Sequence, residues 1–212
     1  MRIDLAERIA ERALAVGVAI TGHELEQLAA YFALLERWNG TINLTSLPLA
    51  AAPAATVDKL VVEPLLAAPD VPDAPIDWGD LGTGGGSPAL PLKIVRPRAG
   101  LMMIESRERK SAFLREAVRS LGMNGAAVIT GRIEDLPTLL PQRLDLVTVR
   151  AVHLDARRLA AIADSLTQAG HLLVFESAHS APYPQGLPLQ EVSRRALGDG
   201  RFGFLTTLRK TS

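Results

Sequence analysis

The chain has 212 residues, of which 48% are hydrophobic, and its 23 Lys/Arg residues balance its 23 Asp/Glu residues. This is enough apolar sequence for one sizeable α/β domain with an appendage, and it excludes a disordered chain. Cysteine is absent, which excludes disulfides, thiolate metal ligands and a cysteine nucleophile. Charges near the N-terminus and the lack of a membrane-length apolar run predict a cytoplasmic protein without signal peptide or membrane span.

The first third of the chain predicts helices. Apolar residues recur at helical spacing over 3–15 and 23–38, and a further helix is expected over about 53–67. Thr21 and Glu24 have the spacing of a capping box, and Asn39-Gly40 is a stop signal. The Pro/Asp-rich stretch 69–75 predicts a boundary, which divides an N-terminal helical segment, 1–70, from a second domain, 71–212.

After this boundary, strand and helix patterns alternate. Strands are predicted over 76–81, 100–105, 126–130, 144–149 and 169–176, with helices over 88–95, 107–121 and 155–167 and a helical turn near 134–140. Such alternation predicts an α/β domain, with a parallel sheet covered by helices on both faces. The strand-like stretch 203–208 predicts an antiparallel edge strand.

A glycine-rich loop follows the first predicted strand and is the most informative feature. Asp80 ends that strand, glycines follow at positions 82, 84 and 86, and Glu105 ends the next strand. Glycine allows the main chain to approach a ligand closely. A carboxylate after the second strand is placed to accept the two hydroxyls of a ribose. The loop therefore predicts a nucleoside-containing cofactor, and a glycine-rich turn without ligand is the alternative.

The spacing of these glycines separates two cofactor classes. A dinucleotide fingerprint needs a third glycine at position 87, where this chain has Ser87. S-adenosylmethionine has no pyrophosphate for a helix N-terminus to bind, and its cationic methionine end favours a nearby carboxylate such as Asp80. We therefore expect S-adenosylmethionine rather than NAD.

Charge is distributed unevenly along the chain. Residues 1–75 contain 5 Lys/Arg and 10 Asp/Glu, whereas residues 76–212 contain 18 and 13. A polyanion such as RNA could bind the more basic part, although an ordinary solvated helix face explains the pattern equally well.

Five segments, in the expected order and spacing, make this chain resemble the RsmG (GidB) family. They are WNGTINLTS at 38–46, DLGTGGGSPALPLKIVRP at 80–97, ESRERKSAFLREAVRSLGM at 105–123, and GRIEDL at 131–136 with VRAVHL at 149–154. The resemblance implies an S-adenosylmethionine-dependent methyltransferase acting on guanine N7 of small-subunit (16S) ribosomal RNA. It also implies a Rossmann-like class I fold with a seven-stranded, mostly parallel sheet and N-terminal helices.

The resemblance also assigns roles to individual residues. The methionine and ribose part of the cofactor would be lined by Asp80, Gly82, Thr83 and Gly84, with Glu105 on the ribose hydroxyls and Ser106 beside it. Ile133 and Glu134 would border the adenine. Lys110, Arg132 and Arg150 would face RNA or the target base.

The chain departs from the family pattern in places. Ser87 and Ala89 replace the usual Phe and Gly, the segment 57–64 lacks the family's His, and acidic Glu176 stands where the family has a basic residue. These departures leave alternatives open. They are a methyltransferase of another RNA, a small molecule or a protein, and a non-catalytic cofactor-binding module of ribosome assembly.

Methylation of guanine N7 requires little from the protein beyond positioning. N7 carries a lone pair and no proton, so no general base is expected. We expect Arg150 to act by positioning, on O6 of the base or on a phosphate. The alternative for Arg150 is an ion pair with Asp145 or Asp155.

No metal or oligomer is expected. The histidines at 23, 153, 171 and 179 lack metal-ligand spacing. Trp38 and Trp78 are predicted as buried anchors between the N-terminal helices and the sheet. The expected partner is small-subunit rRNA or its particle, bound by a monomer.

Overall fold

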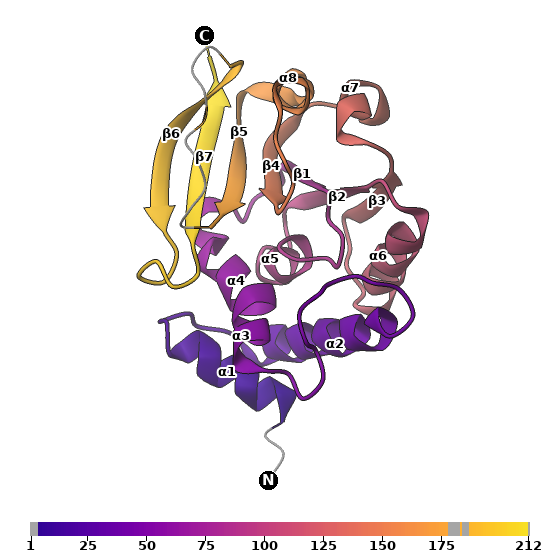
Figure 1. The fold of residues 1–212 in the computed structure, drawn as a ribbon, viewed down its shortest axis with the longest axis vertical. Coiled ribbons are helices and arrows are strands. Elements are labelled where there is room, and N and C mark those ends of the chain that lie inside the picture. Colours follow the sequence, from indigo (N-terminus) through magenta and orange to yellow (C-terminus); the bar gives the residue numbers. More distant parts are fainter. Residues whose placement is uncertain (1–3, 178–182, 184–186, 212) are drawn as a thin grey trace.

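The computed structural model describes residues 4–177, 183 and 187–211. Its centre is a seven-stranded sheet with the order β3-β2-β1-β4-β5-β7-β6 (Figure 1). The strands are β1 (Asp77–Leu81), β2 (Gly100–Glu105), β3 (Ala126–Thr130), β4 (Leu144–Arg150), β5 (Leu166–Glu176), β6 (Leu189–Ala196) and β7 (Phe204–Lys210). The first five are parallel, β7 pairs antiparallel with β5, and β6 pairs antiparallel with β7 and so runs in the direction of the first five. The predicted mostly parallel α/β sheet is confirmed.

Helices cover both faces of the sheet. They are α1 (Leu5–Leu14), α2 (Gly22–Asn39), α3 (Ala54–Val57), α4 (Glu63–Leu66), α5 (Ala89–Val95), α6 (Glu108–Ser120), α7 (Leu136–Leu139) and α8 (Ala156–Ser165). Because successive strand residues point to opposite faces, Leu146 and Val147 of β4 belong to different hydrophobic clusters. The first cluster packs beneath α2, α5 and α6, and the second beneath α7 and α8.

The N-terminal helices form a layer below the sheet in Figure 1. The predicted capping box of α2 is confirmed, since Thr21 and Glu24 exchange side-chain-to-backbone hydrogen bonds of 3.3 and 2.7 Å. One hydrophobic cluster contains residues from both sides of position 70, such as Phe32 and Trp78. The domain boundary near residue 70 stays a prediction.

The helix expected over 53–67 contains a local irregularity. Between α3 and α4, residues Asp58–Val62 form a π-helix, η1. π-Turns alter the regular pairing of backbone carbonyls and frequently occur at functional sites. Here Lys59 and Leu60 each offer a carbonyl to a side chain from the second part of the chain, Arg150 and Ser87 respectively.

The prediction of 203–208 as an edge strand is wrong in one respect. The stretch is antiparallel strand β7, but it lies between β5 and β6, so β6 forms the edge. In β6 only Leu189 is buried and the seven following residues are exposed. A strand with so little burial has no apolar alternation by which its sequence could be recognised.

The two tryptophans differ in their surroundings. Trp78 on β1 is completely buried, as predicted, and its indole donates a hydrogen bond to Thr148. Trp38 is half-buried, and its ring lies edge-on to Phe113 with 5.9 Å between ring centroids. In the part of the chain that the structure describes, no helix has the length and apolar character to cross a membrane.

Candidate functional site

Three neighbouring cavities lie at the carboxyl ends of β1 and β4. A cavity of about 250 Å³ is lined by Thr83, Gly84 and Lys110, and one of about 350 Å³ by Ser106, Ile133 and Glu134. Both are lined by Gly82. A third, of about 650 Å³, shares Arg150 and Ala151 with the first and Val152 with the second. The set lies where parallel α/β sheets bind their ligands.

The glycine loop is fixed by the carboxylate that ends β2. The backbone N–H of Gly84 donates a 2.9 Å hydrogen bond to Glu105, whose other oxygen accepts from the N–H of Arg107 at 2.8 Å. Gly84 has φ of 57°, a left-handed conformation that favours glycine. Glu105 is buried, at 5% exposure, and therefore holds the loop and the start of α6 in one arrangement.

Asp80 is the most unusual group of the site. Its side chain is 1% exposed; Oδ1 accepts a 2.5 Å hydrogen bond from Thr148, while Oδ2 has no partner in the described structure. Burial raises the pKa of Asp80 to about 6. A buried carboxylate oxygen without a donor is costly unless a ligand or water supplies one. This unpaired oxygen fits the ammonium group at the amino-acid end of S-adenosylmethionine.

The cavity of about 350 Å³ brings together the residues assigned to the adenine. Ile133 is buried on one wall, and Glu134 pairs with Arg158 at 2.9 Å. A backbone hydrogen bond and the Arg158 guanidinium keep the pKa of Glu134 below its usual range. Arg158 also lines this cavity, and sequence reasoning missed it. Its only signal was its place three residues after Asp155, the N-cap of α8.

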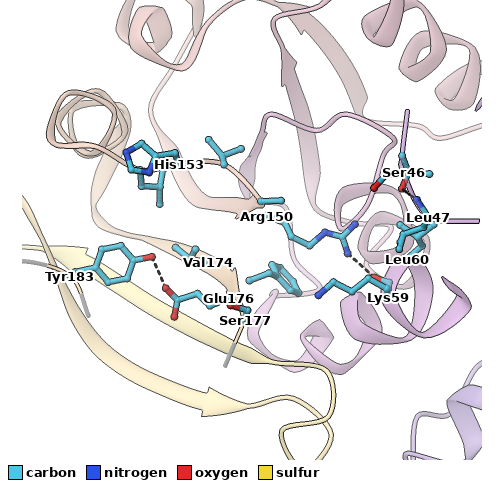
Figure 2. A pocket seen from close by; sticks show the side chains of 15 residues that line it. Ser46, Leu47, Lys59, Leu60, Arg150, His153, Val174, Glu176, Ser177 and Tyr183 are labelled. Carbon is cyan, nitrogen blue, oxygen red and sulfur yellow. Dashed lines mark hydrogen bonds between the residues drawn. The ribbon is translucent and has the colours of Figure 1, made fainter. Parts of the chain in front are cut away.

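Arg150, at the end of β4, is tied to the π-helix. Its Nη1 donates a 2.7 Å hydrogen bond to the carbonyl of Lys59 (Figure 2). The same nitrogen lies 3.7 Å from the Glu63 carboxylate. The anticipated alternative, an ion pair with Asp145 or Asp155, is wrong about the partner. Glu63 itself is 1% exposed, and burial raises its pKa against the opposing effect of Lys59 and Arg150.

The predicted RNA-side cations are in two places. Lys110 lines the cavity of about 250 Å³ together with Arg150, whereas Arg132 lines the cavity that also holds Glu134. The backbone groups of Lys110 and Arg132 are hydrogen-bonded, but within the described residues neither side chain has a hydrogen bond or ion pair. Both cations are therefore available to an anionic ligand.

The largest of these three cavities opens between Arg150 and the carboxyl end of β5. Glu176 lines it, and Figure 2 shows this side chain pointing toward Tyr183, which donates a 2.9 Å hydrogen bond. Thr206 donates to the other oxygen at 2.6 Å, and Arg194 lies 3.4 Å from that oxygen. The acidic departure at Glu176 thus has a cationic partner within the protein.

No metal centre is found among the described residues, where no three His, Asp or Glu side chains are grouped as ligands. His179, one of the four histidines considered from sequence, lies outside those residues.

Tyr31 joins the N-terminal helices to the glycine loop, because its buried hydroxyl donates a 2.9 Å hydrogen bond to the carbonyl of Gly85. We expect Tyr31→Phe to lower the free energy of unfolding by about 1 kcal/mol and to weaken binding of S-adenosylhomocysteine. Denaturant unfolding and calorimetry measure the two effects. Tyr183→Phe is the matched control, since its hydroxyl bonds Glu176 outside this loop. Equal ligand affinity in both variants would contradict the coupling.

Comparison with known proteins identifies relatives over most of the chain. The family model described as rRNA small subunit methyltransferase G (GidB) matches residues 24–182. Ribosomal RNA small subunit methyltransferase G of Neisseria meningitidis (serogroup C, serotype 2a) is 33% identical, with 85% of this chain and 82% of the relative covered. The protein of the same name from Paracoccus denitrificans is 36% identical, with 75% and 72% covered.

Solved structures show the same fold at low sequence identity. A mutant of MtNAS in complex with S-adenosylmethionine superposes with a TM-score of 0.57 and 12% identity, covering 98% of this chain and 73% of that one. The [4+2]-cyclase SpnF gives a TM-score of 0.57 and 17% identity, covering 91% and 97%.

Proposed function

The chain belongs to the family of rRNA small subunit methyltransferase G, and we propose that it methylates N7 of a guanine in small-subunit (16S) rRNA. S-adenosylmethionine is the methyl donor. One observation carries this proposal. The unpaired Asp80 oxygen, the glycine loop bound by Glu105 and the Arg150 side chain all lie at the carboxyl ends of the parallel strands. A cofactor site and a cationic side chain for the base thus adjoin one another.

The residues beneath the glycine loop would hold the cofactor. When bound, S-adenosylmethionine supplies a methyl group made electrophilic by its sulfonium. Asp80 would accept from the amino group, beside Gly82, Thr83 and Gly84. Glu105 already accepts from two backbone N–H groups, but its carboxylate has further lone pairs for the ribose hydroxyls.

The adenine would lie in the cavity of about 350 Å³. Ser106 and Ile133 line that cavity, and Glu134 would accept from the adenine amino group. The ion pair with Arg158 holds the Glu134 carboxylate at the cavity wall.

Arg150 would position the target guanine. One of its N–H groups is bound to Lys59, which leaves other donors of the guanidinium for O6 of the base or a phosphate. Donation to N7 itself would block the lone pair that attacks. Since N7 loses no proton, aligning the base and excluding water supply the catalysis, and such positioning is worth several kcal/mol.

Lys110 and Arg132 would contact the RNA at the cavities of about 250 and 350 Å³ that they respectively line, because both side chains are without a hydrogen bond or ion pair in the described structure. Glu176 is paired with Arg194, so it opposes an RNA phosphate less than its charge suggests. On this proposal the protein acts in the cytoplasm as a monomer, on rRNA or its particle.

Transcripts of small-subunit rRNA made with 7-deazaguanosine test the proposed atom. These lack N7 but keep the Watson–Crick edge, so they should accept no methyl group, whereas ordinary transcripts do. Both are assayed naked and as reconstituted particles. Equal methylation of the deaza and ordinary RNA would contradict the proposal.

Cofactor binding should weaken at acidic pH. Protonation of Asp80, with its pKa of about 6, removes the negative charge that the ligand ammonium needs. Affinity should therefore be full above this pH and fall as pH drops through it. Calorimetry with S-adenosylhomocysteine measures the profile. Methylthioadenosine, which lacks the amino-acid end, should show no such fall; a shared fall would refute the Asp80 assignment.

A further inference from the structure

A buried hydrogen-bond relay runs from the sheet core to Asp80. The indole N–H of Trp78 donates to the hydroxyl of Thr148 at 2.9 Å, and that hydroxyl donates to Asp80 Oδ1 at 2.5 Å. All three side chains are at most 1% exposed. Asp80 and Thr148 are direct partners in the β1–β4 register. Trp78 lies two residues before Asp80, on the same face of β1.

The direction of this relay is determined by its first member. An indole N–H can only donate, so the Thr148 oxygen accepts there and its single proton must go elsewhere. The short contact directs that proton to Asp80 Oδ1. Of the two carboxylate oxygens, one is therefore bound by the protein and the other, Oδ2, is left without a partner in the described structure.

We propose that Thr148 is a positioning residue for Asp80. Because its oxygen accepts from Trp78, its hydroxyl donates to Asp80 Oδ1 and leaves Oδ2 free for the amino group of the cofactor. This inference rests on the cofactor assignment of the proposed function. The terminal torsion of an aspartate is soft, so without Thr148 the carboxylate could rotate. The anion would also lose a donor that stabilises it.

Other groups around Asp80 act on its charge as well. Burial is the dominant effect and raises the pKa of Asp80, and the charge of Glu105 raises it further. The hydrogen bond from Thr148, the nearby Thr83 hydroxyl and the charge of Arg150 lower it. The Thr83 hydroxyl donates its own proton to the main-chain carbonyl of Asp80, at 2.9 Å. Burial, and to a smaller extent the negative charge of Asp80, raises the pKa of Tyr31 of α2. Removing the Thr148 hydroxyl leaves these in place, so the pKa of Asp80 should rise and binding should be lost at a higher pH.

Thr148→Val and Thr148→Ser test the relay, since the first removes the hydroxyl at nearly constant shape and the second keeps it. Calorimetry between about pH 5 and pH 8 measures affinity for S-adenosylhomocysteine and for methylthioadenosine. We expect Thr148→Val to bind S-adenosylhomocysteine about tenfold more weakly, with the midpoint of its pH profile moved upward. Thr148→Ser should match the wild type, and methylthioadenosine should bind all three proteins equally.

A merely structural role for Thr148 gives a different pattern. Equal weakening of both ligands by Thr148→Val, or an unchanged pH midpoint, would overturn the relay. Carbon NMR of the Asp80 carboxyl in the free protein is an independent readout, and an unchanged pKa in Thr148→Val would likewise overturn it. Thr148→Ala replaces the valine variant if that variant does not fold.

The outcomes also separate the relay from the proposed function. If Thr148→Val shifts the pH profile of S-adenosylhomocysteine affinity but the wild type methylates no rRNA, the relay is supported and the rRNA activity is refuted. A wild type that binds no S-adenosylhomocysteine would overturn the relay together with the cofactor assignment.

Discussion

Replacing Gly84 by valine is expected to abolish binding of S-adenosylmethionine. Gly84 has φ of 57°, where a residue with a Cβ is strained by about 1–2 kcal/mol, and a β-branched one is a genuine outlier. Relief of this strain would move the N–H that binds Glu105. The added side chain would also stand at the wall of the cavity of about 250 Å³, where Gly82, Thr83 and Gly84 are proposed to line the methionine end of the cofactor. Calorimetry with S-adenosylmethionine measures the loss.

Gly122 offers a matched control for this substitution. It follows α6 with φ of 60°, and a Cβ built there meets nothing within 4 Å. Gly122→Val therefore introduces the same backbone strain away from the loop, and should lower stability while leaving cofactor affinity intact. Unchanged affinity in Gly84→Val, or an equal loss in both variants, would refute the cofactor placement.

At about pH 8, above the pKa of Asp80, Arg150→Ala is expected to spare cofactor affinity. The same variant should cut methyl transfer about a hundredfold, the cost of a slightly misplaced reacting group. Arg150 is bound to Lys59 and Glu63 rather than to any cofactor-assigned carboxylate, so its loss should not disturb the glycine loop. Single-turnover transfer to rRNA and calorimetry with S-adenosylhomocysteine measure the two quantities separately.

Arg158→Ala should have the opposite effect, a loss of cofactor affinity rather than of the methyl-transfer step. Arg158 pairs with Glu134 in the cavity assigned to adenine, so its removal should weaken cofactor binding first. Equal loss of affinity and transfer in Arg150→Ala would show that Arg150 supports the fold of the site rather than the position of the base.

The places of Asp80, the glycines and Glu105 in the fold were predictable because their signals are local. Asp80 and Glu105 end two neighbouring parallel strands, and the glycines between them allow a conformation other residues avoid. Each signal lies within one strand or one loop, so the sequence alone predicted where these residues lie. The hydrogen bond between Gly84 and Glu105 is the consequence of that spacing in three dimensions.

What the sequence could not predict depends on partners distant in the chain. The relay from Trp78 through Thr148 joins residues 70 positions apart, and the hydrogen bond from Arg150 to Lys59 spans 91. Only the pairing of β1 with β4 and the π-helix bring those groups together. β6 was missed for another reason, because its exposed residues have no apolar pattern.

The most direct test of the central claim is nucleoside analysis after methyl transfer. Purified protein and radiolabelled S-adenosylmethionine are incubated with small-subunit particles and with naked rRNA, and the RNA is digested to nucleosides. The account predicts label in 7-methylguanosine. Label in another nucleoside, or none in a protein that binds S-adenosylmethionine, would contradict it.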